Sequence, residues 1–127
     1  MPSHLSLILY VRDQARACGF YRAVLASEPS LDVPGMTEFS VGGTTLGLMP
    51  EAGIVRLLGE AIVSPSSSKV PRAEAYLVVD DPEAHHARAL AAGARELLPL
   101  GPRDWGHDVS SVADLDEHVL AFARPSR

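Results

Sequence analysis

The sequence has one cysteine, one tryptophan and no long run of charges of a single sign. The lone cysteine, Cys18, excludes an internal disulfide. The formal net charge of -5 arises from 16 acidic and 11 basic residues that are dispersed along the chain, a pattern without the footprint of a nucleic-acid or membrane-surface protein. No apolar stretch approaches the length of a membrane-spanning helix, and residues 1–4 lack the basic and apolar regions of a signal peptide. We therefore expect a cytoplasmic protein that binds neither nucleic acid nor membranes.

One pattern occurs twice in the chain. The segment Leu7–Asp13 (LILYVRD) returns as Ala75–Asp81 (AYLVVDD), and in both copies an apolar strand ends on Val-x-Asp before an alanine-rich helix. A chain of 127 residues with 46% hydrophobic content is long enough for one compact domain and too short for two ordinary ones. The sequence therefore predicts a single domain, residues 1–127, in which two related modules share a core.

The first module is predicted to span residues 4–50. Asp13 stands at the N-cap position of a helix over residues 14–25, whose apolar side chains recur at steps of three and four residues. After Pro29 and Pro34, residues 37–41 and 44–49 form a hairpin across Gly42-Gly43. Three strands are expected after the helix, although the first of them is only weakly marked.

A connector over residues 51–71 is expected to contain a short helical turn or a strand around residues 54–63. The second module, residues 72–124, begins with a strand over residues 74–79. Asp81-Pro82 then supplies an N-cap and a first-turn proline for a helix that ends near Gly93. Residues 95–100, 108–113 and 118–123 are predicted strands. The fold class is therefore α+β, with two βαβββ modules.

Several short motifs follow one another in the order of a known family. They are Phe20-Tyr21-x-x-Val24-Leu25, Ala92-Gly93-Ala94, Asp104-Trp105-Gly106-His107 and Asp114-Leu115-Asp116-Glu117-His118. In this order the chain resembles the vicinal oxygen chelate superfamily of glyoxalases, extradiol dioxygenases and bleomycin resistance proteins, and within it the bleomycin-resistance-like branch. That branch has an Asp-Pro-Asp-Gly turn; the proline and glycine are absent here, so we expect a less tightly specified hairpin.

The resemblance implies two half-barrels of four strands that enclose a shared cavity, with helices on the outer faces and a homodimer as the assembly. It also implies where metal-using relatives hold their ion. One ligand lies seven residues before the aspartate of each Val-x-Asp, and another lies four residues beyond the turn that precedes each last strand. In this sequence these positions are occupied by Ser6, Gly47, Glu74 and Ala121.

Strand alternation gives the same register independently of the family. Leu7, Leu9 and Val11, with Ala75, Leu77 and Val79, form the apolar faces that the helices would cover. The alternate residues then face the cavity. The predicted ligand-binding residues are Ser6, Ile8, Tyr10, Gly47, Met49, Tyr76, Trp105, His107 and Ala121.

The residues at the family positions are poor metal ligands. Glycine and alanine offer no donor, serine is a weak one, and Glu74 alone cannot hold a divalent cation. We therefore predict no metal and no other cofactor. A displaced site that uses His4, Glu74 and His107 stays open as an alternative, whereas the adjacent histidines His85 and His86 are expected to be solvated on the second helix.

Three residues carry the remaining chemistry. Glu74 is predicted to act as a general base or to bind a cationic group, and the alternative is a solvated side chain near a strand end that pairs with Arg72. Trp105 is predicted to stack on a planar ligand, and His107 can contact the ligand or make a structural hydrogen bond. Arg103 is interpreted as a solvated residue at the rim.

These predictions favour a metal-independent protein that binds a small molecule and sequesters an aromatic or cationic antibiotic-like compound. The alternative is a metal-dependent or Glu74-dependent enzyme of the glyoxalase, isomerase or dioxygenase type. A third hypothesis is a partner-binding module, in which side chains would fill the cavity.

Overall fold

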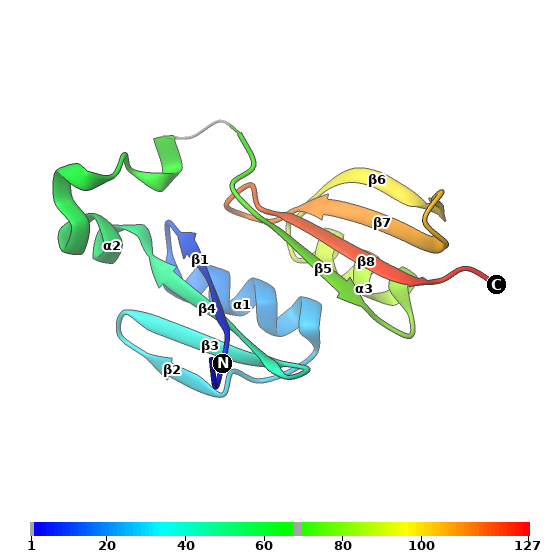
Figure 1. Cartoon of the computed structure of the whole chain (residues 1–127), viewed down its shortest axis with the longest axis horizontal. Helices are drawn as coiled ribbons and strands as arrows, with labels where there is room; N and C mark the ends of the chain where they lie inside the picture. The colour runs from blue at the N-terminus through cyan, green and yellow to red at the C-terminus, as the bar shows by residue number, and fades with distance from the viewer. Residues whose placement is uncertain (1, 68–69) are drawn as a thin grey trace. The chain divides into compact units, whose positions relative to one another are not determined.

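The computed structural model describes residues 2–67 and 70–127, which form two compact units. Residues 2–22 and 26–67 belong to the first unit, and residues 23–25 and 70–127 belong to the second. Each unit contains one four-stranded sheet (Figure 1). The predicted α+β class and the βαβββ order of both modules are therefore confirmed. No helix in the described part of the chain is long and apolar enough to cross a membrane.

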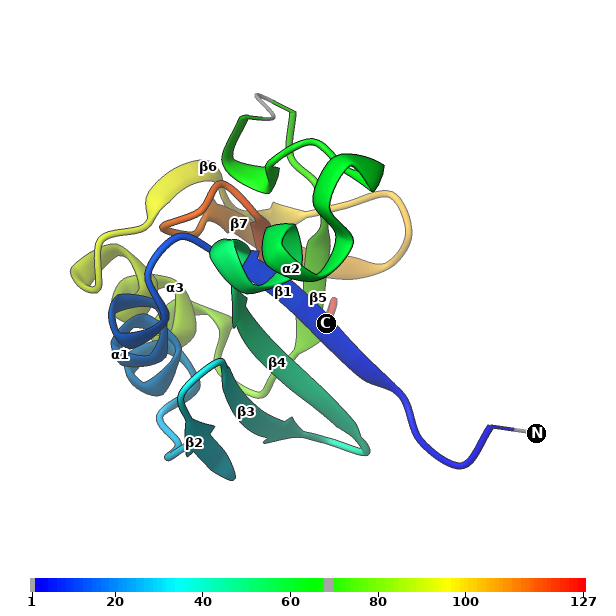
Figure 2. The same cartoon turned by 90° about the vertical axis from the view of Figure 1, so that its left-hand side faces the viewer.

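The first sheet has the strand order β1-β4-β3-β2, which can be followed in Figure 2. Its elements are β1 (Ser6–Val11), α1 (Gln14–Leu25), β2 (Leu31–Val33), β3 (Met36–Val41) and β4 (Thr44–Pro50). The strands β1 and β4 are parallel, whereas the other neighbours are antiparallel. The weakly marked strand of the sequence is therefore β2, the shortest strand, at the edge of the sheet.

The second sheet repeats this topology with the order β5-β8-β7-β6. Its elements are β5 (Glu74–Val78), α3 (Pro82–Ala91), β6 (Arg95–Pro102), β7 (His107–Ala113) and β8 (Val119–Pro125). Here too the first and last strands, β5 and β8, are parallel. Ile8 pairs with Gly47 in the first sheet as Tyr76 pairs with Ala121 in the second, so the repeat in the sequence is a repeat in strand register.

The repeated Val-x-Asp motif caps a helix in both units. The Asp13 carboxylate accepts a hydrogen bond from the Arg16 backbone N–H at 3.0 Å, and the Asp81 carboxylate accepts one from the Ala84 N–H at 3.0 Å. An N-cap of this kind satisfies a backbone donor that has no partner within the helix. The predicted caps are therefore confirmed.

The faces that were expected to pack against the helices are buried only in part. Leu9 and Val11 are 2% and 0% exposed, whereas Leu7 is 39% exposed and Ala75, Leu77 and Val79 are half-buried. Leu48, Leu120 and Phe122 are inaccessible, and Phe20 and Tyr21 of α1 are 3% and 1% exposed. The cysteine of α1, Cys18, lies in the same buried layer. Burial raises the pKa of its thiol, with a smaller contribution from the Asp32 carboxylate, and so disfavours the reactive thiolate. Cys18 is therefore a buried thiol that contributes to packing in the core.

The connector forms the helix α2 (Glu51–Leu58) and the short 3₁₀ helices η1 (Gly59–Ala61) and η2 (Pro65–Ser67). The helical alternative of the sequence interpretation is thus the correct one. A hydrogen-bonded pair holds the connector in place, because the Glu51 carboxylate accepts from the Ser66 N–H at 2.9 Å and from the Ser66 hydroxyl at 2.7 Å.

A buried polar network organises the turn between β7 and β8. Oδ1 of Asp114 accepts from the backbone N–H groups of Asp116 (2.8 Å) and His118 (2.9 Å), and its Oδ2 lies 3.0 Å from His118 Nδ1. Asp114 and His118 are 4% and 2% exposed. The expectation of a loosely specified hairpin is therefore wrong, because the buried Asp114 carboxylate holds the turn by hydrogen bonds although the proline and glycine are absent.

The other side of the His118 ring is also satisfied. Nη2 of Arg72 donates to the Asp116 carbonyl at 2.7 Å and lies 3.2 Å from His118 Nε2. Since arginine is a donor only, Nε2 is the acceptor and Nδ1 carries the ring hydrogen that is donated to Asp114. The histidine that the sequence placed beside a turn is thus a structural residue with both nitrogens occupied.

Glu117 adopts a left-handed backbone conformation in this turn, with φ of 68°. A side chain in this region costs about 1 kcal/mol relative to glycine. Its ion pair with Arg95, 2.6 Å long, joins two exposed side chains and contributes little. We expect Glu117→Gly to raise the free energy of unfolding by about 0.5–1 kcal/mol. Urea unfolding measures this change, and a decrease in stability would contradict the assignment of strain to Glu117.

Candidate functional site

The second sheet has one face covered by α3 and one that we call the open face. Two histidines of α3, His85 and His86, contact the Phe122 ring of β8 with centroid separations of 5.7 and 6.4 Å. Both histidines are half-buried, so the expectation that they are solvated is wrong. Because side chains alternate along a strand, the neighbours of Phe122, Ala121 and Ala123, point to the open face.

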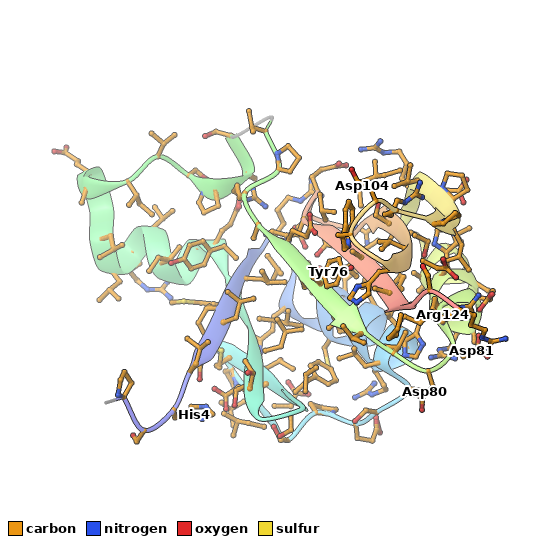
Figure 3. All side chains as sticks on the ribbon, turned by 45° about the vertical axis from the view of Figure 1, so that its right-hand side comes forward. His4, Tyr76, Asp80, Asp81, Asp104 and Arg124 are labelled. Carbon is orange, nitrogen blue, oxygen red and sulfur yellow. The ribbon has the colours of Figure 1, made fainter. Side chains whose placement is uncertain are left out.

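Three of the predicted ligand-binding residues meet on the open face. Nε1 of Trp105 donates a hydrogen bond to the Tyr76 hydroxyl at 3.0 Å, and the same hydroxyl lies 2.6 Å from Nδ1 of His107. The Tyr76 and His107 rings are stacked, with centroids 5.9 Å apart and an angle of 24° between their planes. Figure 3 labels Tyr76 on β5. We call Trp105, Tyr76 and His107 the aromatic cluster.

Hydrogen bonding within the cluster fixes what it can offer a ligand. Trp105 can only donate, so the Tyr76 oxygen accepts from it and can direct its own hydrogen at Nδ1 of His107. In this arrangement Nε2 of His107 carries the ring hydrogen and is a donor. Trp105 is 60% exposed and Tyr76 is 38% exposed, so both rings are accessible. The cluster can therefore stack on a planar molecule and donate a hydrogen bond to it.

Small residues on the central strand allow the cluster to form. Tyr76 comes from β5 and His107 from β7, and β8 lies between these strands. The residues that β8 presents on this face include Ala121 and Ala123, which are buried beside Val109. A methyl group leaves room for the Tyr76 side chain to cross β8, whereas a larger side chain would block it. Ala121 thus contributes to the site by leaving space for the Tyr76 side chain, and it supplies no hydrogen-bond donor.

The equivalent face of the first sheet is occupied by its own side chains. A Cβ atom at Gly47 would lie 2.6 Å from Cδ1 of Ile8 and 3.2 Å from Sδ of Met36, so these side chains fill the space above the glycine. Tyr10 and Met49 are half-buried, and Ser6 is exposed. The predicted residues of this unit are apolar apart from Ser6, and beside Ser6 the paired residue Thr45 hydrogen-bonds to His4.

The residues at the family metal positions do not fit a metal ion. Gly47 and Ala121 supply no donor atom, and Gly47 is covered by Ile8. Ser6 has a single neutral oxygen, which leaves Glu74 as the one anionic group of the set. Within residues 2–67 and 70–127, no three His, Cys, Asp or Glu side chains are grouped so that they could hold an ion.

The displaced site of His4, Glu74 and His107 is also excluded by strand register. Glu74 pairs with Val119 of β8, whereas His107 pairs with Pro125, six residues further along the same strand. This separation corresponds to about 20 Å of strand, far beyond the span of two ligands of one ion. His4 instead hydrogen-bonds to the Thr45 hydroxyl, with 3.0 Å between Nε2 and Oγ1.

Glu74 is exposed at the first position of β5. The Arg72 guanidinium, its suggested partner, is directed at Asp116 and His118. Of the two interpretations of Glu74, the solvated one agrees with this placement.

The sequence interpretation missed the role of Arg103. This residue is half-buried rather than solvated at a rim, and its Nη2 donates to the carbonyls of Pro99 (2.7 Å) and Val109 (2.9 Å). Both carbonyls lie where the register between β6 and β7 shifts. Arg103 therefore braces the hairpin that carries Trp105 and His107. A sequence signal for it is weak, because its partners are backbone atoms at an irregularity.

Known proteins of one family share this architecture. The sequence profile of the Glyoxalase/Bleomycin resistance protein/Dioxygenase superfamily matches residues 3–122. A glyoxalase-related enzyme from Fulvimarina pelagi has 19% sequence identity and a TM-score of 0.80, with 98% of this chain and 88% of that chain covered. A family enzyme from Burkholderia phytofirmans PsJN gives 18% identity and a TM-score of 0.81, with coverages of 94% and 96%.

The structure of TioX from Micromonospora sp. ML1 is also similar. It has 25% sequence identity and a TM-score of 0.72, with 98% of this chain and 99% of that chain covered. No curated protein shows significant sequence similarity to the chain. The similarity thus extends over 88–99% of the length of the three solved structures.

Proposed function

The chain belongs to the glyoxalase/bleomycin resistance protein/dioxygenase superfamily, and from this premise we propose that it binds a small planar molecule without a metal ion. The observation that carries the proposal is the aromatic cluster, in which Trp105, Tyr76 and His107 are joined by hydrogen bonds of 3.0 and 2.6 Å. Such a cluster is pre-organised, so a ligand does not have to order these side chains when it binds.

Donor chemistry supports the metal-free part of the proposal. A catalytic divalent cation needs several anionic or imidazole ligands and an open coordination position. The four family positions provide one carboxylate, that of Glu74, and His107 is already hydrogen-bonded to Tyr76 on one nitrogen. We therefore propose that the protein requires no metal and no other cofactor.

The proposed role is sequestration of an aromatic or cationic antibiotic-like compound by a cytoplasmic homodimer, as in the bleomycin-resistance-like branch. An exposed apolar edge supports the dimer, because Leu97 and Leu98 of β6 are 41% and 39% exposed. Edge strands of this kind are commonly covered by another chain.

Thermal unfolding in EDTA tests the proposal. The panel contains planar aromatic compounds of one to three fused rings in anionic, neutral and cationic forms, together with bleomycin. A ligand present at 100 times its Kd stabilises the native state by about 2.7 kcal/mol, which corresponds to an increase in Tm of roughly 10 °C. We expect at least one planar compound to raise the Tm in EDTA. The proposal would be contradicted if no compound raised the Tm in EDTA, or if compounds raised it only after a divalent metal was added.

A further inference from the structure

Arg103 lies on the same face of the second sheet as His107. The Arg103 N–H donates to the His107 carbonyl at 2.8 Å, and the Gly106 N–H donates to the Arg103 carbonyl at 3.2 Å, so the two residues close the turn of the β6–β7 hairpin. Residues directly opposite one another in an antiparallel pair direct their side chains to the same face. The Cα–Cβ bond of Arg103 therefore points to the open face.

The guanidinium group stays on this face. A Cβ atom at Gly101 would lie 3.8 Å from Nη2 and 3.9 Å from Nη1 of Arg103. Gly101 pairs with Val109, and Val109 packs with Ala121 and Ala123 of the open face. The glycine thus leaves the space that the guanidinium occupies. The positive charge is located on the surface that also carries the aromatic cluster.

Much of the hydrogen-bonding capacity of Arg103 is unused. A guanidinium has five N–H donors, and the two contacts to Pro99 and Val109 are both made by Nη2. Its Nε is buried without a partner, and neither Nη1 nor Nε is bonded to any other residue in the described parts of the chain. Arg124 differs, because Glu83 and Asp108 neutralise it and its hydrogen bond to Glu83 raises its pKa.

We propose that Arg103 binds a carboxylate of the planar ligand. Nη1 of Arg103 and Nε2–H of His107 donate to the carboxylate oxygens, while the ring of the ligand stacks on Trp105. A half-buried guanidinium with no bridging carboxylate among residues 2–67 and 70–127 attracts an anion and repels a cation. This inference rests on the proposed function and specifies the class of ligand as an aromatic carboxylate.

Calorimetric titration of the wild-type protein with three matched probes tests the inference. The probes are 2-naphthoate, 2-naphthamide and 2-naphthylmethylammonium, which share one ring system and differ in charge. All titrations are performed at pH 7 in EDTA. We expect 2-naphthoate to bind at least tenfold more tightly than 2-naphthamide, and the ammonium probe to bind most weakly. Equal binding of the carboxylate and the amide, or tightest binding of the cation, would overturn the inference and leave the proposed function intact.

The variant Arg103→Gln tests whether Arg103 causes the preference for 2-naphthoate over 2-naphthamide. We expect this variant to lose about tenfold in affinity for 2-naphthoate and to bind 2-naphthamide within about twofold of wild type. Arg56→Gln is the matched control, because it removes the same charge from an exposed position of α2 in the first unit. If Arg103→Gln lost affinity equally for 2-naphthoate and 2-naphthamide, the role of Arg103 would be structural only, and the inference would be overturned. Absence of binding by all three probes would overturn both this inference and the proposed function for this ring system. The wild-type comparison stays decisive if Arg103→Gln fails to fold.

Discussion

Replacement of Asp114 by alanine is expected to lower the free energy of unfolding by about 3–5 kcal/mol. The carboxylate accepts from two backbone N–H groups and from the His118 ring, and both side chains are buried. Alanine would leave these three donors without an acceptor in a place that water does not reach. Each buried donor that loses its partner costs about 1–3 kcal/mol, and the losses are shared within one network. Chemical denaturation of the wild type and the variant measures the difference.

Asp104→Ala is the control for this prediction. Asp104 is exposed in the turn of the β6–β7 hairpin, so the same substitution there should change stability by no more than about 0.5 kcal/mol. Asp114→Asn provides a second comparison, because its amide oxygen can still accept from the backbone, and an intermediate loss is expected. If Asp114→Ala were as stable as Asp104→Ala, the turn network would have no role in stability.

Trp105→Ala is expected to have the largest effect on ligand binding. Removing an aromatic platform on which a planar molecule stacks costs about 1–3 kcal/mol, so we expect the Kd for 2-naphthoate to rise about 5- to 150-fold. The indole also donates to the Tyr76 hydroxyl at 3.0 Å, so its loss frees the tyrosine that orients His107. Calorimetry measures the Kd, because the variant has no tryptophan to report by fluorescence.

Two further variants separate stacking from hydrogen bonding. Tyr76→Phe keeps the ring and removes both hydrogen bonds of the hydroxyl, so a smaller loss of about 3- to 10-fold is expected. Leu57→Ala truncates an equally exposed apolar side chain on α2 and should leave the Kd unchanged. Binding by Trp105→Ala that matches the wild type would place the ligand elsewhere.

Local chemistry explains why much of the fold could be predicted from the sequence. Asp13 and Asp81 cap helices through backbone groups three residues away, and such a contact is encoded within the motif itself. Strand alternation likewise assigned Leu9 and Val11 to a buried face. The repeat then related the registers of the two sheets, so the positions that the family resemblance implies for a metal could be identified in both.

The sequence was less informative where a contact depends on distant backbone atoms. Arg103 reaches the carbonyls of Pro99 in β6 and Val109 in β7 beside a shift in register, and no pattern of residue types marks such a shift. His85 and His86 were assigned to solvent from their adjacent positions on the second helix. The helix α3 is rich in alanine, so imidazole rings are among the few side chains large enough to contact Phe122. Tertiary packing therefore overrode the preference of the residue type.

The most direct measurement of metal-free binding at the aromatic cluster is a ¹H–¹⁵N spectrum of the histidine rings recorded in EDTA during titration with 2-naphthoate. The chain has five histidines, of which His107 belongs to the cluster, whereas His4 and His118 are held by Thr45 and Asp114. We predict that the ring signals of His107 shift with saturation and that those of His4, His85, His86 and His118 stay in place. Shifts at the other histidines with His107 unchanged, or shifts of His107 that appear only after a divalent metal is added, would contradict this account.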